Sequence, residues 1–360
     1  MLCAFANAQV KGCTDPLSKN YNPLATENDG SCVYKSASVS PVSSVALPEQ
    51  VRETSGLIVY DTTLFTHNDD ADTNLYVVDS NNGTVLQTVP VAEVVNQDWE
   101  EIAQDEQYIY IGDFGNNVSG NRSNLNILRV SKASLGTSAP EIGQINFSYS
   151  NQTDFTPLSS NSTDFDCEAM VVSNDSIYLF TKQWNSKKTS VYTLSKEPGT
   201  YIAQLKATHD VSGLITGAAY LEDKKLVVLS GYNSLVQPFV YLLYDFKAQD
   251  FFSGNKRKIT LDGMSFHQTE GIATVTGIDY FVTNEKLSQS FINVSQKLHK
   301  ISLSAYLSNY LENLTLGESQ NRIRNLIRIY PNPTREIVHM DIDPALNGLR
   351  YTFYDDKQDK

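Results

Sequence analysis

Five segments of the chain share one pattern of apolar and polar positions. Each begins with a polar residue, continues with a short apolar strand, passes through a turn of Asp, Asn or Gly, and ends in a strand with bulkier side chains. Short apolar runs bounded by such turns are typical of β-strands. The segments are TSGLIVYDTTLFTHND from residue 54, WEEIAQDEQYIYIGDF from 99, CEAMVVSNDSIYLFTK from 167, TGAAYLEDKKLVVLSG from 216 and TEGIATVTGIDYFVTN from 269.

Further strands follow each segment. A third strand with an aliphatic-aromatic core follows every one, and a fourth follows several, as in TVLQTVPV, QINFSYS and KRKITLD. The period of about fifty residues is the size of a four-stranded propeller blade. We therefore predict an all-β fold built on a β-propeller of five blades, or of six if one blade is too degenerate to recognise. The last repeat lacks an obvious fourth strand, so we expect residues 36–48 to complete its blade and close the ring.

The composition of the chain favours β-strands and limits the classes of partner that the protein can bind. The chain is rich in tyrosine, and no segment shows a long helical period. Its net charge of −13 argues against a nucleic-acid partner, because a phosphate backbone needs a basic surface. No run of about eighteen apolar residues occurs, so we expect no membrane span. The charge fits an extracellular protein that binds cations.

Aligning the repeats predicts which side chains share one face of the ring. The first strand of each blade lines the axis and the second runs antiparallel beside it, so the start of one and the end of the other meet at one rim. The first-strand register holds Ser55, Glu100, Glu168, Thr216 and Glu270. The second-strand ends and the segment before Glu270 add His67, Asp69, Asp113, Asn116, Lys182, Trp184, Tyr232, Asn284, Glu285 and His267.

Two interpretations of this rim remain open. Clustered carboxylates repel one another, so Glu100, Glu168 and Glu270 are candidate ligands of Ca²⁺ or another divalent metal, with histidine shifting the preference toward a transition metal. A bound metal could activate water, with Glu270 or His267 as general base. Alternatively, the inner glutamates accept backbone N–H bonds from the next blade and only tie the ring together.

The predicted function follows from that rim. Binding of a small ligand or a divalent metal is the leading function. A metal-assisted hydrolase of phosphate esters or lactones is the second, and a scaffold or adhesion module without a site is the third. No organic cofactor is expected, because no phosphate loop or comparable motif occurs. Loop 150–166 ends at the rim and is either a cover over the site or a surface insertion.

The cysteines predict one disulfide. Cys13 and Cys32 bracket a polar loop with almost no apolar side chains, which cannot hold itself together by burial, so we expect them to be bonded. The acidic and amide side chains of that loop are either weak calcium ligands or turn formers. Cys167 starts an apolar strand and is expected to be a buried small hydrophobe.

Several motifs resemble known families. The openings TEGIA and WEEIA are similar to those of secreted gluconolactonase-like and phytase-like propellers, and the segment around Cys13 and Cys32 resembles a module of secreted flavobacterial proteins. IRIYPNPTREIVHMDID from 327 resembles the start of the C-terminal sorting domain of the type IX secretion (Por) system of Bacteroidota. These resemblances imply a secreted or outer-surface protein that interacts with the type IX secretion machinery and binds an extracellular ligand.

The expected organisation runs from a leader to a sorting domain. Ala6-Asn7-Ala8 resembles a signal-peptidase site, and the C-terminal match covers only the first part of a sorting domain, which we expect to be a truncated β-sandwich. The predicted parts are a residual signal peptide at 1–8, a Cys-bracketed module at 9–35, the propeller at 36–304, a linker at 305–325 and a partial sorting domain at 326–360.

Overall fold

The computed structural model describes residues 9–69, 72–289, 291–314, 327–330 and 339–342. The chain divides into two compact units, Met1–Leu307 and Ser308–Lys360. The second unit contains an antiparallel pair, β26 (Ile327–Tyr330) with β27 (His339–Ile342). The predicted leader and most of the predicted sorting domain lie outside the described residues. A helix covers 304–314, and none of the described helices is long and apolar enough to cross a bilayer.

The first unit is built from four-stranded antiparallel sheets. In four of these sheets consecutive strands are neighbours, so their hydrogen-bonding partners are local in the chain, whereas the last sheet takes its outer strand from the N-terminal segment. The strands are β5 (Thr54–Tyr60), β6 (Thr63–Asn68), β7 (Asn74–Val78) and β8 (Val85–Pro90); β9 (Trp99–Gln104), β10 (Tyr108–Asp113), β11 (Asn126–Ser131) and β12 (Ile142–Tyr149); β13 (Asp166–Val172), β14 (Ser176–Lys182), β15 (Lys188–Ser195) and β16 (Gly199–Asp210); β17 (Leu214–Leu221), β18 (Leu226–Tyr232), β19 (Pro238–Tyr244) and β20 (Asn255–Leu261); and β21 (Thr269–Thr274), β22 (Asp279–Asn284) and β25 (Lys297–Ser302) with β4 (Ser43–Ala46).

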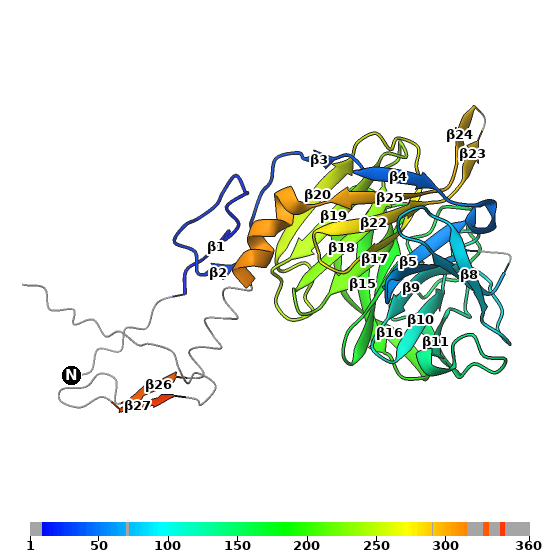
Figure 1. Cartoon of the computed structure of the whole chain (residues 1–360), viewed down its shortest axis with the longest axis horizontal. Helices are drawn as coiled ribbons and strands as arrows, with labels where there is room; N and C mark the ends of the chain where they lie inside the picture. Colours follow the sequence, from blue (N-terminus) through cyan, green and yellow to red (C-terminus); the bar gives the residue numbers. More distant parts are fainter. Residues whose placement is uncertain (1–8, 70–71, 290, 315–326, 331–338, 343–360) are drawn as a thin grey trace, which may run out of the picture. The chain divides into compact units, whose positions relative to one another are not determined.

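The first strands of these sheets close a ring. β5 contacts β9, β9 contacts β13, β13 contacts β17, β17 contacts β21, and β21 contacts β5 again. Sheets arranged around such a ring form a β-propeller, which confirms the propeller part of the predicted all-β fold (Figure 1). β12 and β16 also pair in parallel, which joins two neighbouring sheets at their outer edges.

An N-terminal strand completes the last sheet. β4 pairs antiparallel with β25, and Ser44 Oγ lies 2.7 Å from Nδ1 of His299 on β25. This pairing confirms the expected closure by residues 36–48. A second short strand, β3 (Ser38–Val39), adds in parallel to β20. The chain therefore holds the ring shut through segments more than two hundred residues apart in sequence.

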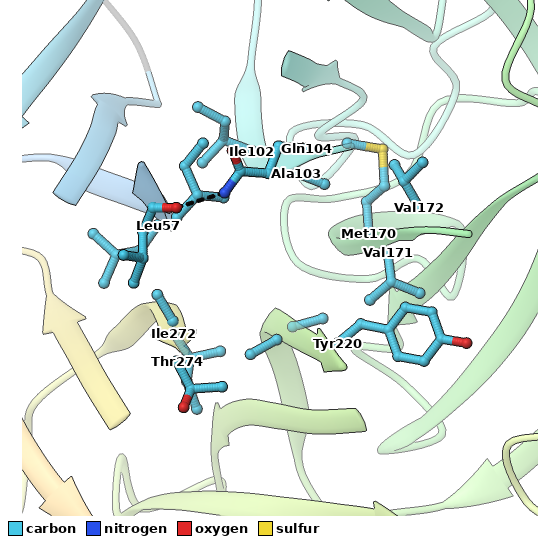
Figure 2. Close-up of a pocket in the computed structure, with 15 residues that line it drawn as sticks. Leu57, Ile102, Ala103, Gln104, Met170, Val171, Val172, Tyr220, Ile272 and Thr274 are labelled. Carbon is cyan, nitrogen blue, oxygen red and sulfur yellow. Dashed lines mark hydrogen bonds between the residues drawn. The ribbon is translucent and has the colours of Figure 1, made fainter. Parts of the chain in front are cut away.

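The core lies between the sheets and along the axis. At one end of the axis lies a cavity of about 110 Å³ that is lined mainly by apolar side chains of the first strands, including Leu57, Met170, Tyr220 and Ile272 (Figure 2). Glycine lets these strands approach closely: a Cβ on Gly271 would lie 2.5 Å from the backbone oxygen of Ser55. The opposite end of the axis is polar.

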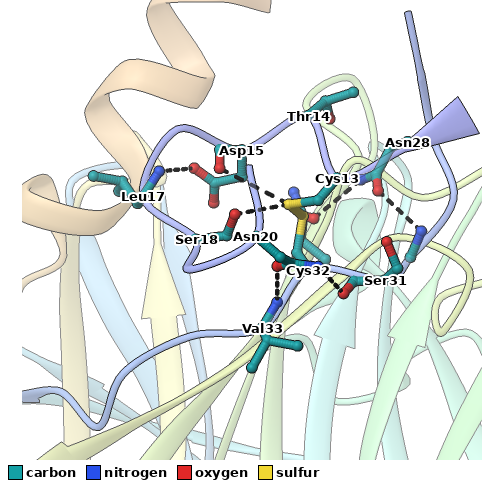
Figure 3. The surroundings of a disulfide bond; sticks show 12 residues. Cys13, Thr14, Asp15, Leu17, Ser18, Asn20, Asn28, Ser31, Cys32 and Val33 are labelled. Carbon is teal, nitrogen blue, oxygen red and sulfur yellow. Dashed lines mark hydrogen bonds between the residues drawn. A yellow bond between two sulfur atoms is a disulfide. The ribbon is translucent and has the colours of Figure 1, made fainter. Parts of the chain in front are cut away.

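The Cys-bracketed module docks on the propeller. Cys13 and Cys32 form the predicted disulfide, with Cα atoms 4.8 Å apart (Figure 3). Asp15 accepts hydrogen bonds from the hydroxyls of Tyr34 (2.8 Å) and Tyr244 (2.5 Å), the latter on β19. The module also contains a parallel pair, β1 (Lys11–Gly12) with β2 (Glu27–Asn28).

The acidic and amide side chains of this module form turns. Asp29 Oδ1 accepts the N–H of Ser31 (3.0 Å), and Asn22 Oδ1 accepts the N–H of Leu24 (3.0 Å). Both are Asx turns, which is one of the two roles left open by the sequence. The remaining short elements of the first unit are η1 (Glu49–Val51), η2 (Lys132–Ser134) and the hairpin of β23 (Leu287–Gln289) with β24 (Ile292–Val294).

Candidate metal centre

A β-bulge opens each first strand at the polar end of the axis. In β9 the ladder to β10 passes from Trp99 to Glu101 and skips Glu100, and in β13 it skips Glu168 in the same way. A bulge leaves its extra residue out of the hydrogen-bonded ladder and changes the direction in which its side chain points. The skipped positions of the five first strands include every residue of the predicted register, Ser55, Glu100, Glu168, Thr216 and Glu270.

These bulges surround a polar axial cavity of about 160 Å³. Side chains from first strands, second-strand ends and neighbouring loops form its walls. Many of them are acidic, and one is a lysine. The lining residues are Ser55, Asp69, Asp98, Glu100, Asn117, Asn161, Glu168, Lys182, Trp184, Tyr232, Gln268, Glu270 and Glu285.

Three buried carboxyl groups form what we call the inner cluster. Glu100, Asp166 and Glu168 each offer an oxygen within 4.8 Å of the others. They come from β9 and β13, two first strands that lie in contact. Gly115 makes room for this arrangement, because a Cβ there would collide with the carboxyl groups of Asp98 and Glu100.

Within the inner cluster, Glu100 has no hydrogen-bond donor to its carboxylate among the described residues. Its side chain is 6% exposed, and it accepts no hydrogen bond from the described residues. Asp166 accepts from the indole N–H of Trp184 (2.7 Å) and the backbone N–H of Asn116 (2.6 Å). A buried carboxylate without a donor or a cation is costly, so Glu100 offers an unused ligand to the cavity.

Lys182 is the cation that the chain itself supplies. Its Nζ lies 2.5 Å from Glu168 Oε2, and it sits 4.9 Å and 5.3 Å from the ring centres of Trp184 and Tyr232. Burial lowers the pKa of Lys182, but Glu168, Tyr232 and Glu270 outweigh burial, so the pKa lies above its usual range. The lysine therefore stays charged and offsets one carboxylate of the cavity.

The other carboxyl groups hold their protons more tightly than usual. Burial, and then the charge of Glu168, raise the pKa of Glu100 well above its usual range. Burial raises the pKa of Asp98 to about 6, and Asp166 adds to the rise. Burial raises the pKa of Glu270 to about 7; Lys182 opposes this shift and Asp69 reinforces it. Burial is the first cause of each of these shifts, and a cation in the cavity would favour the ionised forms of these groups.

Other side chains carry out the structural role that the sequence left open for the inner glutamates. Glu101 is fully buried, and its two oxygens accept the N–H groups of Ile102 (3.0 Å) and Ala218 (2.8 Å). Ser55 and Thr216 each donate to a backbone oxygen of a neighbouring first strand, both at 2.5 Å. The side chains of Glu101, Ser55 and Thr216 therefore tie neighbouring blades together, and the Ser55 hydroxyl ends on the backbone oxygen of Glu100.

The structure does not bring the two predicted histidines to the cavity. His67 is fully buried and packs edge-on against Trp99, and burial lowers its pKa to about 4. His267 lies in the loop before β21, with Nδ1 3.2 Å from the backbone oxygen of Ser265 and its ring beside His299. Without these histidines the cavity presents mainly oxygen donors, which favours a hard cation such as Ca²⁺, Mg²⁺ or Mn²⁺ over a softer transition metal.

Three further predicted residues support the rim without lining the cavity. Asp113 pairs with Arg122 (2.7 Å). Asn116 accepts the N–H of Arg122 (2.9 Å) and donates its amide to the backbone oxygen of Phe165 (3.1 Å). The side-chain amide of Asn284 donates hydrogen bonds to the backbone oxygens of Glu285 and Ser295, and its Oδ1 is hydrogen-bonded to Nε2 of His299.

Five residues of the cavity wall and the inner cluster were not predicted, although the sequence carries a signal for most of them. Asp98 stands two positions before Glu100, Asp166 two before Glu168, and Gln268 two before Glu270. An acidic or amide residue two positions before each of these glutamates is therefore a repeated signal for the same rim. Asn117 and Asn161 come from loops and leave no such pattern. Asn161 belongs to loop 150–166, and its backbone N–H donates a hydrogen bond to the backbone oxygen of Asn117 (2.8 Å). This loop therefore forms part of the cavity wall.

No protein-family model matches the chain, and no curated protein matches its sequence. Among solved structures, the WD40 repeats of RRP9 align with 11% identity and a TM-score of 0.39, over 74% of this chain and 100% of that chain. A glucose dehydrogenase aligns with 8% identity and a TM-score of 0.41, over 72% of this chain and 99% of that chain. Similarities at this level say nothing about the ligand or activity of this chain.

Proposed function

We propose that this chain is a five-bladed propeller that binds a hard divalent cation, with Ca²⁺ as the first candidate, in its polar axial cavity. The observation that carries the proposal is Glu100, a buried carboxylate that faces the cavity within the inner cluster and accepts no hydrogen bond from the described residues. A cation there would be bound by Glu100, Asp166 and Glu168, with further oxygens of the cavity completing its coordination.

Secretion is part of the proposal. The Cys13–Cys32 disulfide suits an oxidising compartment, and the Tyr-Pro-Asn-Pro-Thr motif at 330–334 supports export by a type IX system of Bacteroidota. Calcium is abundant outside cells, so an extracellular setting would keep a site of modest affinity filled.

Thermal unfolding of the metal-free protein tests the cation site. Because a ligand that binds only the folded state stabilises it by mass action, Ca²⁺ at one hundred times its Kd should raise the melting temperature by roughly 5 °C. Glu100→Gln should shift this response to at least tenfold higher Ca²⁺. It should not lower the melting temperature without metal, because it removes one of several repelling charges.

The exposed Glu106 in the turn before β10 provides the matched control. Glu106→Gln makes the same chemical change on the opposite side of the ring and should leave the calcium response intact. A parent protein that ignores Ca²⁺, together with a Glu100→Gln variant that melts at clearly lower temperature, would favour the scaffold alternative.

A metal-assisted hydrolase is a second candidate, and one observation favours it. Glu270 lines the cavity, and burial brings its pKa to about 7, the range in which a carboxylate works best as a general base at neutral pH. In this function Glu270, rather than His267, would accept the proton of the attacking water. The predicted substrate classes remain phosphate esters and lactones.

A further inference from the structure

Arg257 lies on β20, where three parts of the first unit meet. Its guanidinium carbon is 4.7 Å from the ring centre of Tyr34, in the Cys-bracketed module, and 4.4 Å from the ring centre of Tyr306, in the helix at 304–314. The Tyr306 hydroxyl donates to the backbone oxygen of Ser38 (2.9 Å) on β3, the strand that pairs with β20. The guanidinium is therefore held among segments that are far apart in the sequence.

This guanidinium is a buried cation with unused hydrogen-bond donors. Arg257 is 8% exposed, and its Nε and Nη1 are buried with no hydrogen-bond partner among the described residues. Burying a charged group costs free energy unless acceptors replace the water that it loses, and a counter-charge reduces that cost further. The described residues supply neither to these two nitrogens.

Other arginines of the described residues are satisfied by the chain itself. Arg122, whose side chain is 12% exposed, lies 2.7 Å from Asp113 Oδ1. Arg129, whose side chain is 13% exposed, lies 2.8 Å from Glu197 Oε2. Because each of these guanidinium groups has a carboxylate acceptor, Arg257 stands apart from arginines of similar burial.

The carboxylate that is bonded to Tyr34 does not serve as the missing acceptor. Asp15 Oδ2 accepts the hydroxyls of Tyr34 (2.8 Å) and Tyr244 (2.5 Å). Asp15 Oδ1 accepts the backbone N–H of Leu17 (2.8 Å). Both oxygens of Asp15 therefore already have donors of their own.

The neighbours of Arg257 along β20 add positive charge. Lys256 and Lys258 flank it, and their ammonium groups donate to backbone oxygens, among them those of Gly254 (2.7 Å) and Val211 (2.9 Å). Backbone oxygens satisfy these donors without neutralising their charge. In a chain of net charge −13, this basic strand is a place where an anion would be attracted.

An oxyanion would supply both missing features. Carboxylate, phosphate and sulfate groups present paired oxygens that match the guanidinium fork, and they carry the opposite charge, whereas a water molecule supplies only an acceptor. Nη2 of Arg257, unlike Nε and Nη1, is not a buried atom without a partner. Since Nη2 shares one edge of the fork with Nη1 and the other with Nε, an anion that reaches Nη2 can also accept from a buried nitrogen.

We infer that Arg257 binds a small oxyanion, a carboxylate, phosphate or sulfate group, at the junction of the Cys-bracketed module, β20 and the helix at 304–314. Arg257 does not line the polar axial cavity, so this inference does not depend on the proposed cation site. The bound anion would neutralise the buried charge and strengthen the docking of the module on the propeller.

Calorimetric titration of the full chain with sodium phosphate, sodium sulfate and sodium acetate tests this inference, with the ionic strength held constant by sodium chloride. The parent should bind one oxyanion per chain. Arg257→Gln should weaken this binding at least tenfold, because it removes both the charge and the fork. Arg129→Gln is the matched control: Arg129 also lies over a tyrosine ring, that of Tyr108 at 4.3 Å, but it is paired with Glu197, so anion affinity should match that of the parent.

The three salts also identify the chemical source of the ligand. Tighter binding of acetate indicates a carboxylate ligand, and tighter binding of phosphate or sulfate indicates a tetrahedral oxyanion. A parent that binds none of the three overturns the inference, and so does an Arg257→Gln chain that binds as well as the parent. If circular dichroism shows that Arg257→Gln does not fold, Arg257→Lys takes its place. Lysine keeps the charge but lacks the fork, so the same loss of at least tenfold is expected, and unchanged binding would overturn the inference.

Discussion

Glu100 and Glu101, two adjacent glutamates of β9, have different roles. Consecutive side chains of a strand point to opposite faces, and the bulge in β9 turns Glu100 toward the cavity while Glu101 enters the ring. Glu101 accepts backbone N–H groups of β9 and β17, whereas Glu100 accepts none from the described residues. The same residue type therefore stabilises the ring at one position and offers a ligand at the next.

Substitution of Glu101 should separate these roles. In Glu101→Gln the side-chain NH₂ would face a backbone N–H donor, which leaves two buried donors without an acceptor. We expect a loss of about 2–3 kcal/mol in the free energy of unfolding, measured by urea denaturation without metal. The number of Ca²⁺ bound by the folded variant should not change. A Glu101→Gln chain as stable as the parent would show that these two bonds do not hold the ring.

At the scale of elements, the sequence predicts the sheets better than the loops. The repeated strand pairs, the register from Ser55 to Glu270 and the closing strand follow from apolar periodicity, because burial on both faces of a blade restricts which residues can occupy those positions. The bulges were not predicted, since an extra residue in a strand leaves no compositional mark.

A loop and a bulge account for the two histidines that the alignment misplaced, and a loop supplies Asn161, which was not predicted. His267 belongs to the segment before β21, where period-two alternation does not yet apply, so its side chain could not be assigned to a face. His67 lies within β6, close to its end. The bulge of β5 opposite His67 changes the local register, and the imidazole is buried against Trp99. Asn161 reaches the cavity wall from a loop whose course depends on tertiary contacts.

At the scale of the whole molecule, the buried acids couple stability to pH. The folded-state pKa of Glu270, about 7, lies above its ordinary value of 4.5, and that of Asp98, about 6, lies above 3.8. A raised pKa means that the stabilising contribution is present at low pH and is lost as pH rises through the folded-state value. These two groups therefore oppose folding increasingly between about pH 4 and pH 7.

Protons and cations should compete for this cavity. We expect the rise in melting temperature caused by a fixed Ca²⁺ concentration to be small at pH 5 and several times larger at pH 7.5, because protons occupy the carboxylates at the lower pH. In Glu270→Gln this difference between the two pH values should shrink. An equal effect of Ca²⁺ at both pH values would place its binding at groups that are ionised throughout, such as exposed carboxylates.

The position of the bound cation tests the central claim most directly. Crystals of the full chain grown with Mn²⁺ should give an anomalous difference peak in the polar axial cavity, at about 2.2 Å from carboxylate oxygens of Glu100, Asp166 and Glu168. Crystals of Glu100→Gln grown in the same way should lose that peak or show it greatly weakened. An empty cavity in the parent, with manganese only at surface carboxylates or at none, would contradict the account.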